Sequence, residues 1–300
     1  GGLALGALCA AAARPAAACE VARAAVVPVV LRAGHPLVTA RLDGQRASFI
    51  LDTGAQRSLL TPEAVRRFRL KLDPWVGTTT IGIGGIERHR NAEVAELRLH
   101  GLALRQNTLL RGLSLSVGRI PTGQMGGAPV DGILGRDVLS AFDLSLDLGR
   151  RRITLYRVRD CRGRFLPWRR SYVPVPSLPG YRAVLGIPVH ADGHVLRAMI
   201  DTGSTSALLS AAGMARLGLT QANLAREPMA EASGIGPRTL RVRVYRLGWL
   251  AVGASVATGV DVVAAPVVLT PVLDLLLGVD WLATHRVWLS YATGQVFVAR

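Results

Sequence analysis

The feature that most constrains this chain is an internal duplication. The tripeptide Asp-Thr-Gly stands at residues 52–54 directly after an apolar run, and it returns at residues 201–203 after a second apolar run. By composition alone, one copy of this tripeptide is expected about 0.1 times in such a chain, so a single copy would be a weak motif. Two copies in matching surroundings indicate two homologous halves.

An Asp-Gly pair precedes each tripeptide at the same distance, at residues 43–44 and 192–193. Asp-Gly between alternating apolar residues is a strong signal for a two-residue hairpin turn, because both turn positions need a positive φ. Each tripeptide therefore ends the second strand of a predicted hairpin. We place these strands at residues 47–51 and 195–200.

Three more landmarks follow in the same order in both halves. They are a short helix at 61–68 and 210–217, a glycine-rich turn at 81–86 and 233–236, and an apolar-apolar-Gly segment at 133–135 and 276–278. Aromatic residues make up only 5% of the chain while glycine, valine and leucine are frequent, which favours short strands and tight turns over a helical bundle. The sequence predicts a mainly β fold with two similar lobes and short helices.

The boundary between the lobes is predicted at residues 158–180. Four prolines are expected to exclude regular structure there, namely Pro167, Pro174, Pro176 and Pro179. We interpret the segment as a basic linker between an N-terminal lobe at 26–157 and a C-terminal lobe at 181–300. Nine arginines lie between residues 150 and 170, so the alternatives are a solvated linker and a contact surface for anionic lipid or an acidic partner.

The net charge of +16 ordinarily raises nucleic acid as a partner. Here the basic residues are 35 arginines and one lysine, and they are scattered along the chain. This bias is typical of a GC-rich genome, and no zinc, helix-turn-helix or aromatic stacking motif accompanies the charge. We predict no nucleic-acid partner.

Residues 1–18 resemble a secretory signal peptide. Residues 1–13 form an Ala/Leu run without an acid, and small residues follow at 16–18 before Cys19. The run is too short to cross a bilayer, which needs about 20 residues. We therefore predict a periplasmic or secreted protein. The alternatives are an Ala-rich disordered tail and a lipoprotein acylated at Cys19.

Three cysteines occur, and Cys9 would be removed with the signal peptide. Cys19 and Cys161 then remain as an even pair in an oxidising compartment, where disulfides persist. We consider both a Cys19–Cys161 disulfide and two unrelated thiols. A disulfide would close a long loop across the predicted N-terminal lobe.

The paired Asp-Thr-Gly motifs and the repeated landmarks resemble the aspartic proteases, specifically the retropepsin-like branch fused into one polypeptide. The resemblance covers residues 26 to 300. It implies two β-barrel lobes related by pseudo-twofold symmetry, with Asp52 and Asp201 meeting at the axis. It also implies an endopeptidase that acts on extended peptide or protein substrates as a monomer, with neither a cofactor nor a metal.

The chemistry of such a pair follows from electrostatics. Two carboxylates about 3 Å apart in a partly desolvated site cannot both stay charged, so Asp52 and Asp201 would share one proton. The charged carboxylate can take a proton from a water that attacks the peptide carbonyl, while its protonated partner donates to the carbonyl oxygen.

The resemblance assigns roles to the residues around the two acids. The residues expected to support the catalytic loops are Thr53, Gly54, Ala55, Thr202, Gly203 and Ser204. The residues expected to form two substrate-binding flaps are Ile81, Gly82, Ile83, Gly84, Gly85, Ile86, Gly234, Ile235 and Gly236. Packing behind the loops are Ile133, Leu134, Gly135, Leu276, Leu277 and Gly278.

Three departures from the retroviral pattern stand out, one of which is Val279 in place of the arginine in the second half. Gln56 and Thr205 occupy positions where an acid usually pairs with an arginine such as Arg136, so that ion pair is not expected here. Ser204 follows the second motif where Ala55 follows the first, and its hydroxyl could stabilise the carboxylate of Asp201. This predicts an asymmetric dyad with Asp201 charged and a mildly acidic pH optimum.

Two further function classes fit the same sequence. A catalytically inactive peptide-binding module would keep the fold without turnover, because an intact motif does not guarantee activity. An envelope-associated structural protein held by its positive charge would bind surfaces whether or not either Asp is present.

Overall fold

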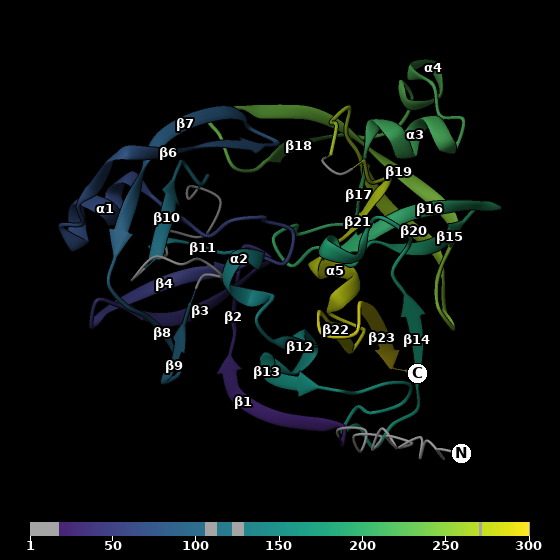
Figure 1. The fold of residues 1–300 in the computed structure, drawn as a ribbon. Coiled ribbons are helices and arrows are strands. Elements are labelled where there is room, and N and C mark those ends of the chain that lie inside the picture. The colour runs from purple at the N-terminus through teal and green to yellow at the C-terminus, as the bar shows by residue number, and fades with distance from the viewer. Residues whose placement is uncertain (1–17, 106–112, 122–128, 270–271, 300) are drawn as a thin grey trace, which may run out of the picture.

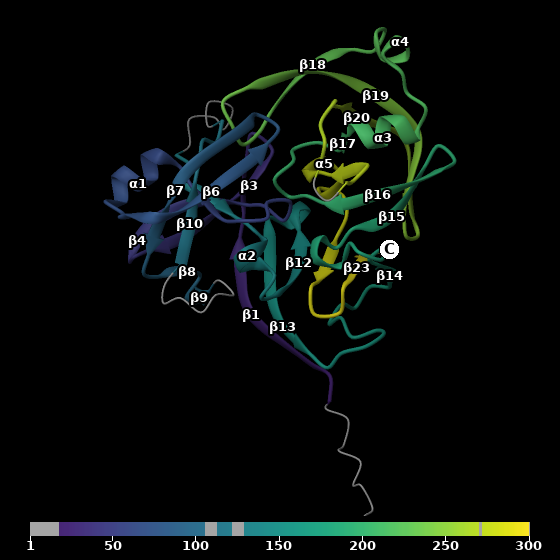
Figure 2. The same ribbon diagram turned by 45° about the horizontal axis from the view of Figure 1, so that its top comes forward.

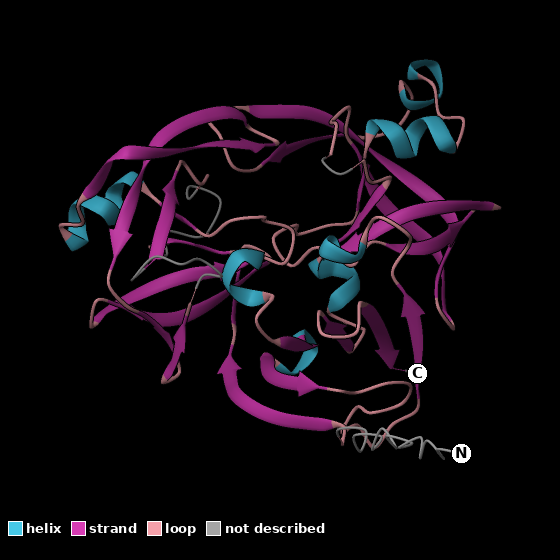
Figure 3. Cartoon of the chain, in the orientation of Figure 1, coloured by secondary structure: helices cyan, strands magenta, loops and turns pink. Residues whose placement is uncertain are grey.

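The computed structural model describes residues 18–105, 113–121, 129–269 and 272–299. The signal-peptide prediction for residues 1–18 and Cys9 fall almost wholly on residues 1–17, outside the described residues. The chain folds into two mainly β lobes that stand side by side above a shared sheet (Figures 1 and 3). The predicted fold class is confirmed. No helix in the described part of the chain has the length and hydropathy needed to cross a membrane.

The N-terminal lobe is built on one ten-stranded sheet. Its strands in spatial order are β6 (Leu72–Gly82), β7 (Gly85–Val94), β10 (Leu113–Val117), β5 (Leu59–Leu60), β11 (Gly132–Leu134), β4 (Gln45–Leu51), β3 (His35–Leu42), β8 (Leu97–Leu99) and β9 (Leu102–Leu104), and β2 (Val30–Arg32) pairs with β3. Helices α1 (Pro62–Phe68) and α2 (Arg136–Leu139) accompany the sheet.

The C-terminal lobe repeats this plan with a seven-stranded sheet. Its strands in order are β15 (Ile187–Ala191), β16 (His194–Ile200), β21 (Leu275–Leu277), β17 (Leu208–Leu209), β20 (Ser255–Ala264), β19 (Thr239–Val252) and β18 (Met229–Ser233). An additional pairing of β15 with β19 closes most of the sheet into a barrel. Helices α3 (Ala211–Arg216), α4 (Gln221–Leu224) and α5 (Val279–Leu282) belong to this lobe.

A six-stranded sheet joins the two lobes from below (Figure 2). Its order is β1 (Glu20–Pro28), β13 (Arg152–Arg159), β12 (Asp143–Asp147), β22 (Val287–Ser290), β23 (Gln295–Ala299) and β14 (Tyr172–Pro176). At its centre β12 pairs with β22, so that Leu144 faces Leu289 and Leu146 faces Val287. Because these residues are fully buried or nearly so, the central pair joins the hydrophobic cores of the two halves. Two short 3-10 helices lie at Leu148–Arg150 and Arg182–Val184.

The local sequence signals explain the hairpins and helices. Asp43, Gly44, Asp192 and Gly193 all have positive φ, between 45° and 82°, which confirms the predicted two-residue turns. Helix α1 begins after Thr61, whose hydroxyl accepts a hydrogen bond from the backbone N–H of Ala64. Helix α3 begins in the same way after Ser210.

The expectation that prolines exclude regular structure from 158–180 is wrong for Tyr172–Pro176. This stretch is the edge strand β14 and pairs with β23, an edge position that tolerates proline because the missing N–H can face away from the sheet. Neighbouring Trp168 is buried in a cluster with Tyr172, Trp288 and Phe297. Much of the segment is therefore packed onto the shared sheet and is not a solvated linker.

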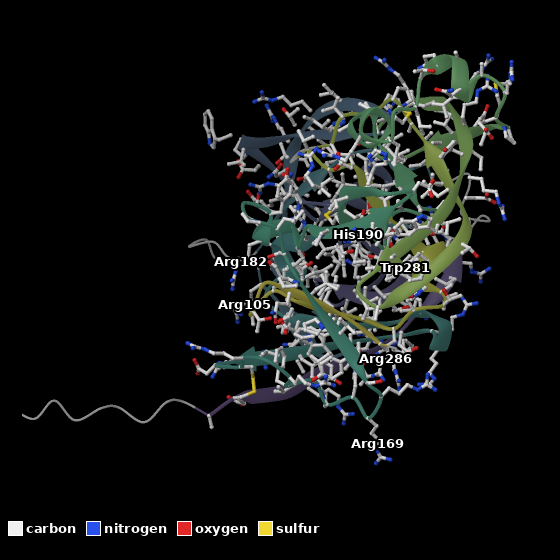
Figure 4. The ribbon with its side chains drawn as sticks, turned by 90° about the vertical axis from the view of Figure 1, so that its right-hand side faces the viewer. Arg105, Arg169, Arg182, His190, Trp281 and Arg286 are labelled. Atoms are coloured by element: carbon white, nitrogen blue, oxygen red, sulfur yellow. A yellow bond between two sulfur atoms is a disulfide. The ribbon has the colours of Figure 1, made fainter. Side chains whose placement is uncertain are left out.

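A disulfide joins Cys19 to Cys161, 142 residues later in the chain. It links the start of β1 to the segment that follows β13, its partner strand in the shared sheet. Figure 4 shows it as the yellow bond beside β1, with the exposed side chain of Arg169 at the lower edge of the molecule. The pairing considered from the sequence is thus present in the structure.

Candidate active site

Each Asp-Thr-Gly loop leaves the end of a strand that is held in a parallel pair. Strand β4 pairs with β11 and strand β16 pairs with β21, so the apolar-apolar-Gly segments lie directly beside the strands that carry the acids. The backbone N–H of Asp52 donates to the carbonyl of Leu134 at 3.0 Å, and that of Asp201 donates to Leu277 at 2.9 Å. These buried strands fix the point at which both loops begin.

The glycines that follow these segments are required by close packing. A Cβ at Gly135 would lie 2.6 Å from the backbone carbon of Arg57, and one at Gly278 would lie 2.5 Å from that of Ser206. Because these neighbours are backbone atoms, they cannot move aside cheaply. Gly135 and Gly278 therefore let each helix start press against the rear of an active loop.

The two loops are tied together by threonines in a nearly symmetric arrangement. The backbone N–H of Thr53 donates to Oγ1 of Thr202 at 3.0 Å, and the reciprocal bond is 3.1 Å. Each hydroxyl also donates to the opposite lobe, from Thr53 to the carbonyl of Ile200 at 2.8 Å and from Thr202 to that of Leu51 at 2.6 Å. Both threonines are buried, so these bonds act without competition from water.

This crossing places the two carboxyl groups against each other. A Cβ at Gly54 would lie 2.4 Å from the carboxyl carbon of Asp201, and a Cβ at Gly203 would lie 2.3 Å from that of Asp52. Each glycine thus leaves room for the acid of the opposite lobe. Asp52 and Asp201 are each only 8% exposed and interact directly through their side chains. Residues that are 149 positions apart in the sequence share one site.

The surroundings make the two acids unequal. Burial raises the pKa of Asp52, while backbone N–H groups of Gly54 and Ala55 offset part of this rise by donating to Oδ1 at 2.8 Å each. Burial and the charge of Asp52 together raise the pKa of Asp201 well above its ordinary value, although the Gly203 N–H lowers it in part by donating to Oδ1 at 2.8 Å. The environment therefore favours charge on Asp52 and the proton on Asp201.

The contact on which the prediction of a charged Asp201 rests, from the Ser204 hydroxyl to its carboxylate, is not formed. The hydroxyl of Ser204 donates to the carbonyl of Ser206 at 2.7 Å instead of to the Asp201 carboxylate. The Ser204 N–H is directed mainly at the backbone carbonyl of Asp201, at 3.3 Å, so it stabilises that carboxylate less than the Ala55 N–H stabilises Asp52. Serine hydroxyls often bond to nearby backbone carbonyls, and here the carbonyl of Ser206 takes the place of the carboxylate as the acceptor.

The two glycine-rich turns meet above the site as paired flap tips, where β6–β7 and β18–β19 arch toward each other (Figure 1). The Gly84 N–H donates to the Ile235 carbonyl at 3.0 Å, and the Arg238 N–H donates to the Gly84 carbonyl at 3.0 Å. The Gly236 N–H donates to the carbonyl of Arg119 at 3.2 Å. A Cβ on Gly84 or Gly236 would collide with the other tip, so only glycine allows this contact.

Each flap tip places an isoleucine against the apolar cluster of the other lobe. Ile235, from the C-terminal flap, packs on a cluster of the N-terminal lobe that includes Ile50 and Ile133. Ile83, from the N-terminal flap, packs on a cluster of the C-terminal lobe that includes Met199. These clusters adjoin the two catalytic loops, because Ala55 belongs to the first and Met199 lies just before Asp201.

Ile81 and Ile86 do not share this position. They face each other across the hairpin of β6 and β7 and expose 72% and 69% of their surface. Neither belongs to the two apolar clusters, and their predicted role in lining a substrate pocket stays a prediction.

His35 is a residue of the site that the sequence analysis missed. It begins β3, and the preceding Gly34 touches Thr205 of the opposite catalytic loop. Burial lowers the pKa of His35, although the charge of Asp52 and the backbone of Gly203 act in the opposite direction. Its Nδ1 atom is buried without a partner among the described residues. A histidine in a strand carries no motif, so only the folded arrangement reveals it.

Comparisons with known proteins agree with this geometry. A sequence profile of the aspartyl protease family matches residues 38–138 and 187–281, which together are well over half of the chain. The chain belongs to the aspartyl protease family, as a two-lobe member. A search of curated protein sequences finds no match.

Among solved structures, the chain resembles the crystal structure of aspartic proteinase from Irpex lacteus. The TM-score is 0.50 at 14% sequence identity, and the match covers 94% of this chain and 97% of that chain. At this identity the match supports the two-lobe fold alone. Within the described residues, no group of three or more His, Cys, Asp or Glu side chains is placed to hold a metal ion.

Proposed function

We propose that this protein is an aspartic endopeptidase that hydrolyses peptide bonds with a water held between Asp52 and Asp201. The observation that carries the proposal is the contact between the two buried carboxyl groups, which the threonine bonds of both loops hold in place. Burial raises the pKa of both acids, and two adjacent carboxylates favour a state in which they share one proton. A base and an acid then stand together.

The different surroundings of the two acids suggest which one acts as the base and which as the acid. The Asp52 carboxylate takes a proton from the water while the water oxygen bonds to the peptide carbonyl carbon. At the same time Asp201 gives its proton to the carbonyl oxygen. The resulting neutral diol then collapses. Asp52 returns its proton to the departing nitrogen, one diol hydroxyl returns a proton to Asp201, and the C–N bond breaks. Water is consumed, and the products are an amine and a carboxylic acid.

The clusters beside the catalytic loops suggest the class of substrate. Because Ile83 and Ile235 already occupy apolar surroundings on either side of the acids, a substrate with apolar side chains flanking the cut could take over these contacts as the flaps lift. The flap backbones offer hydrogen-bonding groups to an extended peptide, as strand addition requires. We expect cleavage between two apolar residues, by a monomer that supplies both acids.

The test is hydrolysis of a fluorogenic peptide library by the wild type, Asp52→Asn and Asp201→Asn. Each substitution is expected to lower kcat by about 100- to 10,000-fold or more, because it removes the base or the acid. Asp261→Asn is a matched control, since Asp261 is an exposed acid paired with Arg246. Near-full activity of either dyad variant would refute the proposal.

The same experiment addresses the inactive peptide-binding module. That alternative predicts peptide binding by the wild type without any new amino terminus in the products. Peptide binding is followed by fluorescence anisotropy and product formation by mass spectrometry. Release of fragments by the wild type, abolished in both Asn variants, would favour the enzyme.

We also propose that the protein works in the periplasm or outside the cell. The Cys19–Cys161 disulfide supports this, because disulfides persist in oxidising compartments. Weak contact of the Arg-rich segment with an anionic membrane remains a prediction. Some of these arginines have intramolecular roles, since Arg164 stacks on Tyr172 at 4.6 Å and Arg157 lies 5.6 Å from the Phe142 ring.

A further inference from the structure

Arg136 is a buried cation directly behind the catalytic loops. It is the first residue of α2, and its backbone N–H donates to the carbonyl of Ala55 at 2.9 Å. Its side chain crosses to the other lobe, where Nη1 donates to the carbonyl of Ala183 at 2.8 Å. Only 9% of the residue is exposed, and its Nε has no partner among the described residues.

A buried guanidinium keeps its charge, and leaving such a charge uncompensated is costly. No carboxylate of the described residues forms an ion pair with Arg136, and Gln56 stands where the retroviral pattern has an acid. Its neighbour Asp137 is engaged elsewhere, accepting from the N–H and hydroxyl of Ser58 at 2.8 and 2.7 Å.

Burial lowers the pKa of Arg136, and the groups that counter this electrostatically are Tyr291, Asp52 and Asp201. Tyr291 is partly buried, and burial raises the pKa of its hydroxyl, which therefore stays neutral. Asp143, close to Tyr291, accepts hydrogen bonds from Trp288 and Ala292, and burial raises its pKa as well. Among the described groups that act on Arg136, the catalytic pair is the one expected to carry negative charge.

We propose that Arg136 is the counter-cation of the catalytic pair, so that its fixed charge helps to keep one of the two carboxyls ionised in acid. Because no acid neutralises it locally, its field acts on Asp52 and Asp201 instead. The residue touches no substrate and is therefore a positioning residue. This inference rests on the proposed function only for its kinetic readout, since the titration of the pair can be measured without turnover.

Only the N-terminal lobe places a cation at this position. In the C-terminal lobe, Val279 occupies the equivalent position, with its backbone N–H donating to Ser204 at 2.8 Å as that of Arg136 donates to Ala55. Val279 is buried and uncharged. Among the described residues, His35 also acts on Asp52 electrostatically, and burial lowers the pKa of His35. Arg136 is positive throughout the working pH range.

The test compares Arg136→Met, which removes the charge, with Arg136→Lys, which keeps it. We expect the acidic limb of the kcat/KM profile to move to higher pH in Arg136→Met, with about three- to tenfold lower kcat/KM at pH values on that limb. Arg136→Lys should restore the wild-type limb. A purely structural role predicts instead equal losses at every pH and no rescue by lysine. Coincident limbs for wild type and Arg136→Met would overturn the proposal.

A second variant covers the outcome in which Arg136→Met fails to fold. Gln56→Asp would give Arg136 a local carboxylate, so we expect the same upward shift of the acidic limb together with unchanged or higher thermal stability. An unmoved limb in a folded Gln56→Asp protein would also overturn the proposal.

A titration keeps this inference separate from the proposed function. Carbon-13 NMR of aspartate carboxyls follows the pair directly, with Asp52→Asn and Asp201→Asn used for assignment. If the wild type cleaves no peptide but its paired acids still titrate at higher pH in Arg136→Met, the proposed function fails and the inference about Arg136 stands. If the titration is unchanged, the inference fails whatever the activity.

Discussion

The two halves of the molecule surround the acids with matching backbones and different side chains. The reciprocal threonine bonds differ by only 0.1 Å, and each acid is held by the equivalent strand. The charged groups, however, come from the N-terminal half. Arg136 corresponds to Val279, and His35 stands at the sequence offset that pairs Asp52 with Asp201, opposite the buried Val184. Backbone symmetry brings two acids together, and the side chains give them different surroundings.

The largest expected difference between the halves concerns the disulfide, which belongs to the N-terminal half. Cys161→Ser should lower the free energy of unfolding by about 2–5 kcal/mol, because it releases a long loop in the unfolded chain. Chemical denaturation measures this loss. Cys19→Ser should cost the same, and the double variant no more than either single one. Stability equal to that of the oxidised wild type would show that β1 needs no covalent attachment.

The threonine bonds test the symmetry itself. Thr53→Val and Thr202→Val each leave a buried N–H and a carbonyl without a partner, so each should lower the free energy of unfolding by about 1–3 kcal/mol. The two losses should be equal within error. Thr39→Val, at an exposed position of β3, is the control. Clearly unequal losses would mean that one lobe carries the junction.

The unequal acids predict a pH-dependent difference in stability. A raised pKa in the folded state stabilises the protein below the pKa of the unfolded carboxyl, and this contribution is lost as the pH rises through the folded pKa. Asparagine cannot ionise, so Asp201→Asn should be more stable than the wild type at pH 7, by about 1 kcal/mol or more, with the gap closing in acid.

Thermal unfolding at several pH values measures this gap. Asp52→Asn should gain less at pH 7, because the charge of Asp52 is already stabilised by two backbone N–H groups. A larger gain for Asp52→Asn would reverse the assignment of base and acid.

The smallest effect is expected at the residue that first suggested asymmetry. Ser204→Ala removes one hydrogen bond to the Ser206 carbonyl, so it should lower the free energy of unfolding by about 1 kcal/mol or less. It should leave the acidic limb of the kcat/KM profile in place. Movement of that limb would show that the hydroxyl reaches the Asp201 carboxylate during the reaction.

Much of the fold follows from local sequence. The Asp-Gly turns, the capping residues Thr61 and Ser210, and the alternating apolar strands all form as their patterns predict, because each depends on neighbours within a few residues. The prediction that the prolines of β14 exclude a strand was wrong because it depended on a contact that is distant in sequence. Pro174 and Pro176 are compatible with a strand only at a sheet edge, and edge position depends on β23, which lies more than a hundred residues away in the chain.

For the site, the sequence by itself determined that two equivalent acids exist, since a repeated motif is visible without any coordinates. Only the tertiary structure decided how those acids differ. The structure shows that two N–H groups donate to the Asp52 carboxylate and that the Ser204 hydroxyl bonds to a backbone carbonyl instead of to Asp201. It also shows that Arg136 and His35, both from the N-terminal half, lie near the acids. Electrostatic interactions act through space, so the order of residues along the chain does not reveal them.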